Sequence, residues 1–416
     1  MTAATHDSTT QTASPAFDVS KLTVENAVAK LIDHANTLSA SDLFIAAEED
    51  RTVISVRALG LVRHISITTA DLGRRYVAHL KAHAGMEMGE KRRPLDGRWI
   101  YRDSDNEATD LRINVIPTVH GEDVAIRLLP RTRKLYNLQS VGLTTEQYNL
   151  VTGMVDSLGG LVLITGPTGS GKTATLYACL QRLNDGQRKI NTIEDPVEYT
   201  LPGLRQSQVN PLIDLGFAEL LRSVLRQSPD VIMIGEIRDL ETAATAVHAA
   251  NSGQLVFATI HSGQAAGAIQ ALRSLGVHPH FLATSLRGVI AQRLVRTLCP
   301  KCKTSFELDE ALETFEEVKD WLKGDEGKHL FASRGCDACN QSGYAGRTGL
   351  FEVISVSSTI RNLVADGKPT GEIRNQAISE KMLTLRQAAL LKVAQGETST
   401  EEIFRVIPSE HLMLEE

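Results

Sequence analysis

The sequence predicts an α/β protein in which a smaller α+β domain precedes a mostly parallel sheet covered by helices on both faces. Its 416 residues, with 42% hydrophobic and 23% charged content, are enough for two or three compact cores. From Leu161 to about Val295, short apolar strands alternate with longer helical segments, which is the pattern of a parallel sheet with helical crossovers. A cysteine-bearing segment and helices rich in Leu, Ala and Glu follow, running to Pro408.

The N-terminal part mixes helical and strand patterns. Residues 1–21 contain few bulky apolar groups and are expected to form a flexible tail. In residues 22–130, apolar spacing favours two helices, near Val24–Ala35 and Ala70–Ala84. Short β-like runs favour four strands, which are Thr52–Arg57, Leu61–Ile67, Leu111–Ile116 and Asp123–Leu129. We therefore expect an α+β domain here, followed by a polar, basic linker over residues 131–143.

Three further regions follow the linker. Residues 144–298 are expected to form the α/β core, residues 299–345 a zinc-binding insertion, and residues 346–416 a C-terminal helical region. The net charge of −6 gives no general attraction to nucleic acid. No apolar run approaches the roughly 18 to 20 residues that span a bilayer, and the N-terminus lacks the pattern of a signal peptide. We expect a cytoplasmic protein that has no transmembrane segment and binds no nucleic acid.

A phosphate-binding motif follows the first apolar strand of the core. The segment 166–173 fits G-x-x-x-x-G-K-[ST] and lies between the strand Leu161–Thr165 and the helical run Ala174–Leu183, which is the context that this motif requires. Its residues are Gly166, Pro167, Thr168, Gly169, Ser170, Gly171, Lys172 and Thr173. The glycines let backbone N–H groups turn toward phosphate oxygens, the lysine reaches the outer phosphates and the threonine hydroxyl can ligate Mg²⁺. The motif predicts that ATP and Mg²⁺ bind here.

Two acidic sites accompany this motif. The turn 192–199 contains three carboxylates, among them Glu194, and such groups can polarise an attacking water or hold Mg²⁺. An acidic turn on its own is usually a solvated loop. A second apolar strand, however, starts at Val231 and ends in Glu236, the arrangement by which P-loop ATPases place a carboxylate beside the metal. Gly235 stands where many of these enzymes have aspartate.

A longer signature identifies a family. The stretch 221–239 reads Leu-Arg-Ser-Val-Leu-Arg-Gln-Ser-Pro-Asp-Val-Ile-Met-Ile-Gly-Glu-Ile-Arg-Asp, and it closely resembles the signature of the ATPases of type II secretion and type IV pilus assembly. The resemblance covers nearly the whole chain, through Lys91–Arg98, the phosphate-binding motif, the acidic turn Glu194–Glu198, the strand that ends in Gly235–Glu236, and Ala258–His261. In the family, the last three segments are called the Asp box, the Walker B motif and the His box.

The resemblance implies a RecA-like P-loop ATPase core and a role for each site residue. Glu194 would activate the attacking water, Glu236 would hold the Mg²⁺ shell and His261 would sense the outer phosphate. Whether Glu194 or Glu236 is the stronger base stays open. Arg112 and Arg127 match family positions that reach the nucleotide from the first domain, where a planar guanidinium suits phosphoryl charge. Surface ion pairs on half-exposed strands are the alternative for both arginines.

The implied function is that of a cytoplasmic hexameric ATPase, which powers pilus or pseudopilus assembly or type II protein secretion. Its implied partner is the platform protein of such a machine, at the inner face of the cytoplasmic membrane. A nucleic-acid motor is one rival, disfavoured by 5% aromatic content and the lack of a basic stripe. A nucleotide-gated scaffold with little hydrolysis is the other, and it rests on Gln254, a neutral amide where the family often has a histidine. The long N-terminal docking region of many members has no counterpart in these 416 residues, so we expect its partner contact to be lost or replaced.

Four of the five cysteines form two Cys-x-x-Cys pairs separated by 33 residues, namely Cys299, Cys302, Cys336 and Cys339. Without an export signal, such pairs indicate metal binding rather than disulfides. Four thiolates make a closed tetrahedral Zn²⁺ site, so the metal would staple a projecting loop and take no part in catalysis. By the resemblance, such tetrads mark the assembly and secretion branches of the family and are typically absent from retraction motors. A faint likeness of 359–368 to a retraction-motor motif leaves the direction of the motor open.

Overall fold

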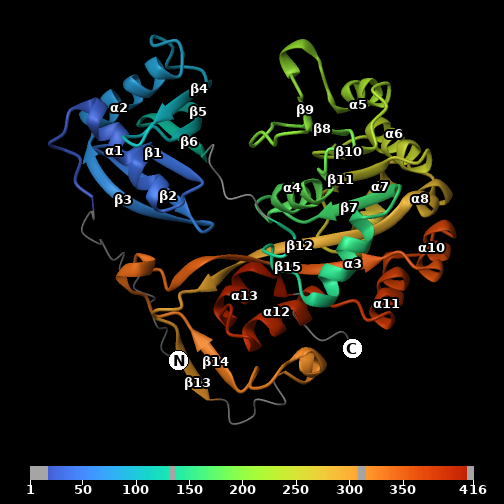
Figure 1. Ribbon diagram of the computed structural model, residues 1–416. Helices are drawn as coiled ribbons and strands as arrows, with labels where there is room; N and C mark the ends of the chain where they lie inside the picture. The colour runs from blue at the N-terminus through green and yellow to red at the C-terminus, as the bar shows by residue number, and fades with distance from the viewer. Residues whose placement is uncertain (1–16, 131–136, 308–314, 410–416) are drawn as a thin grey trace, which may run out of the picture. The chain divides into compact units, whose positions relative to one another are not determined.

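The computed structural model describes residues 17–130, 137–307 and 315–409, and the chain divides into two units, Met1–Lys134 and Leu135–Glu416 (Figure 1). The first unit is an α+β domain and the second contains an α/β core, so the predicted fold class is confirmed. Residues 1–16 of the expected tail and residues 131–136 of the expected linker lie outside the described residues.

The first unit is a six-stranded antiparallel sheet with the strand order β3-β2-β1-β6-β5-β4. Its elements are α1 (Val24–Thr37), β1 (Asp42–Ala47), β2 (Arg51–Ala58), β3 (Leu61–Thr69), α2 (Ala70–His83), β4 (Leu95–Arg102), β5 (Ala108–Thr118) and β6 (Gly121–Pro130). Helix α1 begins after Thr23, whose hydroxyl accepts a hydrogen bond from the Asn26 N–H, and it buries Leu31 and Ile32 in the core of this unit. The sequence pattern does not predict β1 and β4.

The second unit is built on a seven-stranded sheet with the strand order β15-β12-β7-β11-β10-β8-β9. These strands are β7 (Gly160–Thr165), β8 (Ile190–Glu194), β9 (Arg205–Gln208), β10 (Val231–Ile234), β11 (Leu255–Ile260), β12 (Leu286–Leu298) and β15 (Tyr344–Ser355). All neighbouring pairs are parallel except β12 and β15, which are antiparallel. Helix α3 (Thr145–Val155) precedes β7, and the helices between the strands are α4 (Lys172–Leu183), α5 (Phe217–Leu225), α6 (Leu240–Asn251), α7 (Ala265–Ser274) and α8 (Pro279–Ser285).

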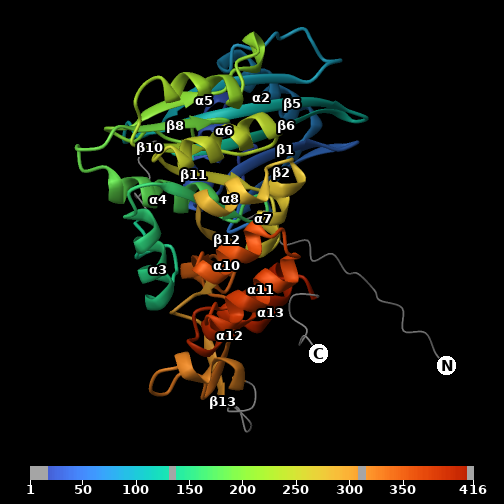
Figure 2. The same cartoon turned by 90° about the vertical axis from the view of Figure 1, so that its right-hand side faces the viewer.

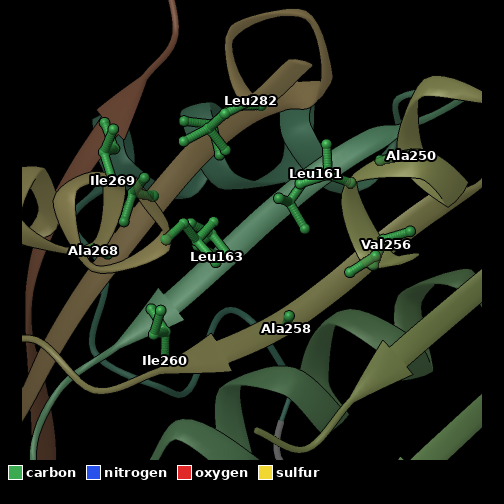
Figure 3. Close-up of a cluster of buried hydrophobic side chains, with 14 of the residues drawn as sticks. Leu161, Leu163, Ala250, Val256, Ala258, Ile260, Ala268, Ile269 and Leu282 are labelled. Atoms are coloured by element: carbon green, nitrogen blue, oxygen red, sulfur yellow. The ribbon is translucent and has the colours of Figure 1, made fainter. Parts of the chain in front are cut away.

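Helices cover both faces of the central strands of this sheet. Alternate residues of each strand point to opposite sides, so both sets of side chains are buried. On one face, Leu161 and Leu163 of β7 pack with residues of β11, α6, α7 and α8, as Figure 3 shows. On the other face, Val162 and Ile164 pack with residues of α3 and α4. This two-sided burial explains why the core strands are continuous apolar runs in the sequence.

A cysteine-bearing insertion and four helices complete the second unit. The insertion leaves the sheet at the end of β12, forms the two-stranded sheet of β13 (Thr304–Glu307) and β14 (His329–Ala332), and returns at β15. The helices α10 (Ser358–Ala365), α11 (Thr370–Ser379), α12 (Leu385–Ala394) and α13 (Thr400–Val406) gather on one side of β12 and β15 (Figures 1 and 2). The region 346–416, expected to be helical, therefore begins with strand residues up to Ser355 before its helices start. In the described part of the chain, no helix combines the length and apolar character needed to cross a membrane.

Candidate functional site

The predicted site segments meet at one edge of the sheet in the second unit. Strands β7, β11, β10 and β8 are neighbours and run parallel, so their carboxyl ends lie at the same edge. The phosphate-binding motif, residues 166–173, is called the P-loop below and follows β7. His261 follows β11, Glu236 lies two residues after β10, and Glu194 is the last residue of β8. In open α/β sheets, ligands bind beyond the carboxyl ends of the strands.

The P-loop backbone has the form of a phosphate cradle. Gly166, Gly169 and Gly171 have φ angles of 147°, 77° and 88°, in the region that favours glycine. A Cβ atom on Gly166 would lie 2.4 Å from the carbonyl oxygen of Gln292, so packing also requires glycine there. Helix α4 begins after Gly171 without a side-chain cap, which leaves the N–H groups of its first turn for an anion.

Lys172 is a half-buried cation surrounded by carbonyl oxygens. Its Nζ donates hydrogen bonds to the carbonyl oxygens of Gly166 at 2.8 Å and Pro167 at 3.1 Å. Burial lowers the pKa of Lys172, and the nearby negative charge of Glu236 acts in the opposite direction. An anion in the loop would supply the opposite charge that this ammonium group lacks among its hydrogen-bond partners.

Glu236 links the Walker B, His box and Asp box segments. Its Oε1 lies 2.7 Å from His261 Nε2, and its Oε2 accepts a hydrogen bond from Arg238 Nε at 2.7 Å. Arg238 Nη1 in turn lies 3.5 Å from Asp195 Oδ2. The Glu236 side chain is 17% exposed and that of His261 is 56% exposed, so the imidazole is the more accessible of this pair.

Glu194 is enclosed by three hydrogen-bond donors. Tyr177 Oη donates to its Oε2, while Thr192 Oγ1 at 2.6 Å and Gln206 Nε2 at 3.1 Å donate to its Oε1. The residue is 3% exposed. Burial raises the pKa of Glu194, and the three hydrogen bonds offset only part of this effect. A carboxyl with a raised pKa suits a proton acceptor near neutral pH, and within the described part of the chain Oε2 accepts only the hydrogen bond from Tyr177.

The two glutamates thus differ in their relation to the P-loop. Glu236 acts electrostatically on Lys172, whereas Glu194 is held by side chains of α4, β8 and β9. Tyr177 and Gln206 are the residues that the sequence reasoning missed. Tyr177 reads as an ordinary core residue of α4, and Gln206 lies in β9, whose sequence Arg-Gln-Ser-Gln has no apolar pattern.

The structure places Gln254 far from this edge. Gln254 directly precedes β11, whereas His261 directly follows it, and the carbonyl of Gln254 accepts from the Gly160 N–H at the start of β7. At about 3.3 Å per residue, the two positions are roughly 20 Å apart. The absence of a histidine at position 254 therefore does not remove a group from the P-loop edge of its own chain.

Arg112 and Arg127 belong to the first unit and are directly paired across β5 and β6. Arg127 Nε lies 3.5 Å from Asp42 Oδ1, and the side chain of Arg127 is 64% exposed. Arg127 thus forms the surface ion pair that was the alternative to nucleotide contact, and its guanidinium group also stays largely exposed.

The four cysteines of the insertion converge. Their Sγ atoms all lie within 4.8 Å of one another, with Cys299–Cys336 at 4.0 Å, Cys302–Cys339 at 3.8 Å and Cys336–Cys339 at 3.7 Å. Four ligands at about 2.3 Å from a tetrahedral Zn²⁺ have edges of about 3.8 Å, so the cluster fits that ion. The N–H groups of Cys336 and Gly343 each donate to Cys339 Sγ at 3.2 Å, which favours a thiolate there.

The fold and this site define a P-loop nucleotide-binding protein with a RecA-like core and a separate four-cysteine centre. The family model of the Type II/IV secretion system protein matches residues 18–405, and the chain belongs to this family. The predicted family resemblance is therefore confirmed.

Two relatives illustrate the similarity. The type II secretion system ATPase E of Vibrio cholerae serotype O1 is 41% identical over 368 residues, which cover 88% of this chain and 72% of that protein. The type IV pilus assembly ATPase PilB of Thermus thermophilus is 38% identical over 376 residues, covering 90% of this chain and 42% of that protein.

Solved structures support the fold. The ATPase DotB of Legionella pneumophila aligns with a TM-score of 0.69 at 22% identity and covers 93% of this chain and 96% of its own. The pilus retraction motor PilT with bound ADP aligns with a TM-score of 0.61 at 24% identity, covering 91% of this chain and 96% of its own.

Proposed function

We propose that this protein hydrolyses ATP to power the assembly of a pilus or pseudopilus, or type II protein secretion. The observation that carries the proposal is the convergence of the P-loop, Glu194, Glu236 and His261 at one sheet edge, beside the ammonium group of Lys172. The family implies ATP and Mg²⁺ as ligands. Relatives described as a secretion ATPase and a pilus assembly ATPase support the cellular task.

The P-loop side chains have distinct tasks in this proposal. The N–H groups of the loop and Lys172 bind the phosphates, and the hydroxyl of Thr173 holds Mg²⁺ together with Glu236. Bound Mg²⁺ neutralises phosphate charge and polarises the phosphoryl oxygens. His261, paired with Glu236, senses the outer phosphate. By the family resemblance, Arg112 and Arg127 are further candidates for binding the nucleotide through their guanidinium groups.

Glu194 takes the proton of the attacking water in this proposal. Its raised pKa supports the assignment, and its three hydrogen bonds leave about one lone-pair site of the carboxylate for a water. The competing assignment gives the base role to Glu236.

Steady-state ATP hydrolysis by the purified chain tests the function. We expect turnover that depends on Mg²⁺ and that rises when the protein assembles. A chain that binds ATP in every assembly state but never hydrolyses it would contradict the proposal and favour the nucleotide-gated scaffold. Turnover stimulated by DNA would instead favour the nucleic-acid motor.

Matched substitutions separate the two glutamates. Glu194→Gln is expected to lower kcat by roughly 100-fold while ATP binding is retained, because the amide cannot accept the proton. Glu236→Gln is expected to weaken the binding of Mg²⁺, seen as a higher Mg²⁺ concentration for half-maximal rate. Nucleotide binding and steady-state rates measure both effects. An unimpaired Glu194→Gln protein would transfer the base role to Glu236.

The assembly and location follow from the family in this proposal. We expect a ring of six chains at the inner face of the cytoplasmic membrane, where it would act on the platform protein of a secretion or pilus machine. Particle size measured with and without nucleotide checks the ring, and a protein that stays monomeric with nucleotide and partner would rule it out.

The four-cysteine centre holds Zn²⁺ in this proposal, and loss of the metal is expected to lower the stability of the protein. Cys339→Ser is expected to reduce zinc from about one ion per chain and to lower the thermal unfolding midpoint, because the metal fixes an insertion with a small core. Elemental analysis and thermal unfolding check this. Cys179→Ala is the control: this thiol lies in the core, and burial raises its pKa to about 12, so zinc content should not change. Far less than one zinc per wild-type chain in reductant would contradict the assignment.

A further inference from the structure

The backbone on both sides of His261 is held by one buried hydroxyl. Thr165, the last residue of β7, is fully buried. Its Oγ1 donates to the carbonyl oxygen of Ile260 at 2.7 Å and to that of Ser262 at 3.0 Å. A hydroxyl has one proton, so the two carbonyls share it. The carbonyl groups of the residues before and after His261 are therefore tied to the residue that directly precedes Gly166 of the P-loop.

A second hydroxyl does the same for Glu236. Thr259 of β11 is 3% exposed, and its Oγ1 donates to the carbonyl oxygen of Gly235 at 2.5 Å. The N–H of Ile237 donates to the carbonyl oxygen of Thr259 at 2.9 Å. The residues before and after Glu236 are thus both bound to the neighbouring strand, although β10 itself ends at Ile234.

The segment 261–264, between β11 and α7, is also held by packing and by a hydrogen bond to a buried acid. Glu352 of β15 is 1% exposed, and its Oε1 accepts from the N–H of Ala265, the first residue of α7. A Cβ atom on Gly267 would lie 2.4 Å from Ser262 Oγ, so the turn between β11 and α7 has little room to shift. The segment 261–264 is consequently fixed from β7 on one side and from β15 on the other.

We infer that Thr165 and Thr259 are positioning residues, which set where His261 and Glu236 lie relative to the P-loop. The inference rests on the proposed function for the roles of these two side chains, and it adds the means by which three strands hold them in register. Threonine suits the task because its branched Cβ restricts the hydroxyl to few orientations, and a buried hydroxyl that donates to a carbonyl defines the distance between two strands. Small displacements of such groups have large effects on phosphoryl transfer, which depends on positioning.

The same hydrogen bonds also connect the P-loop with His261 and Glu236. Thr165 and Gly166 are adjacent, so any shift of the P-loop when phosphate enters acts directly on the peptides that flank His261. Thr259 lies on β11, two residues before His261, and its hydrogen bond to the carbonyl oxygen of Gly235 links this strand to the residue before Glu236. Filling of the P-loop is thereby linked to the positions of both side chains.

Isosteric substitutions test the inference. Thr165→Val and Thr259→Val remove only the hydroxyl, and Thr165→Ser and Thr259→Ser restore it. Each valine variant is expected to lower kcat by roughly 10- to 100-fold. Thr165→Val should also reduce the preference for a non-hydrolysable ATP analogue over ADP while the affinity for ADP is kept, and the serine variants should recover these properties. Thr398→Val is the matched control, because Thr398 is fully buried and its Oγ1 donates to the carbonyl oxygen of Arg296 at 2.8 Å, outside the site.

Double substitutions show whether each threonine acts through its partner. Thr165→Val combined with His261→Ala should be no worse than His261→Ala alone, and Thr259→Val combined with Glu236→Gln no worse than Glu236→Gln alone. Additive losses, or a loss of ADP affinity equal to the loss of analogue affinity, would overturn the inference. So would a valine variant that behaves as the Thr398→Val control does. If Thr165→Val fails to fold, Thr165→Ala removes the hydroxyl without adding volume and is judged by the same criteria.

The binding readout keeps this inference separate from the proposed function. Affinities for ADP and for the analogue need no turnover, so a wild-type chain that fails to hydrolyse ATP would refute the function and still allow the ratio of affinities to be compared. A wild-type ratio that Thr165→Val leaves unchanged would refute the positioning role even in an active enzyme.

Discussion

Lys172→Ala is expected to lower ATP turnover by at least about 100-fold, because the ammonium group is the charge that the P-loop offers to the outer phosphates. The folded state should survive the change. Burial already disfavours the charged form of this side chain, and its hydrogen bonds go to carbonyls of its own loop. Nucleotide binding and thermal unfolding, measured on the same preparation, separate the loss of function from a loss of structure.

Lys189→Ala is the matched control. Its Nζ also donates to a main-chain carbonyl, that of Gln227, but it lies just before β8, at the opposite end of the parallel strands from the P-loop. Turnover should be unchanged in this variant. A Lys172→Ala protein that still binds and hydrolyses ATP at the wild-type rate would refute the site.

Glu402→Ala is expected to cause a large loss of stability, although Glu402 lies outside the site. Glu402 on α13 is fully buried and accepts hydrogen bonds from the side chains of Arg296 at 2.6 and 2.8 Å and Arg405 at 2.6 and 2.7 Å. Removal of the carboxylate leaves these guanidinium groups without their partner, and breaking such a buried network costs about 3–5 kcal/mol. A clear fall in the midpoint of urea unfolding is the expected observation.

The same carboxylate predicts a dependence on pH. Burial disfavours its ionisation, but the hydrogen bonds from Arg405 and Arg296 outweigh burial, so the pKa of Glu402 is lowered in the folded protein. A depressed carboxyl pKa stabilises the fold above the unfolded value of about 4.3, and this stabilisation is lost as the pH falls toward the folded pKa. Glu402→Gln should therefore be less sensitive to acid than wild type between pH 5 and pH 3, roughly the window in which glutamate titrates. Glu316→Ala, which breaks an exposed pair with Lys319, is the control and should unfold as wild type does. Equal unfolding midpoints for Glu402→Ala and this control would contradict the prediction.

The P-loop edge was predictable from the sequence because its motifs are local and follow apolar strands. The P-loop is eight consecutive residues between a strand and a helix, and Glu236 and His261 each follow the end of a continuous apolar run. Parallel strands bring such ends together without further information. The four cysteines were predictable for a similar reason, since each Cys-x-x-Cys pair supplies half a metal site by itself.

Other elements depend on contacts that a single sequence does not reveal. Strand β9 has only polar residues and forms because β8 offers it a ladder of hydrogen bonds. For the same reason, the contact of Gln206 with Glu194 could not be anticipated. The segment Leu350–Ile354, apolar except for Glu352, fits a buried strand or a helix equally well, and its pairing with β12 decides the outcome. The distance between Gln254 and His261 was also not evident, because a motif read along the sequence hides the length of the strand between its ends.

Strand β12 spans from the P-loop to the metal centre. The side-chain amide of Gln292 donates to the carbonyl oxygen of Ser170 at 2.6 Å, and Cys299 directly follows the last residue of the strand. Cys299 lies seven positions after Gln292, roughly 23 Å away at the rise of a strand, and β15 is paired along this length. A tilt of about 5° at Gln292 would move Cys299 by roughly 2 Å. The pair of β12 and β15 thus connects the P-loop contact of Gln292 directly with the start of the insertion.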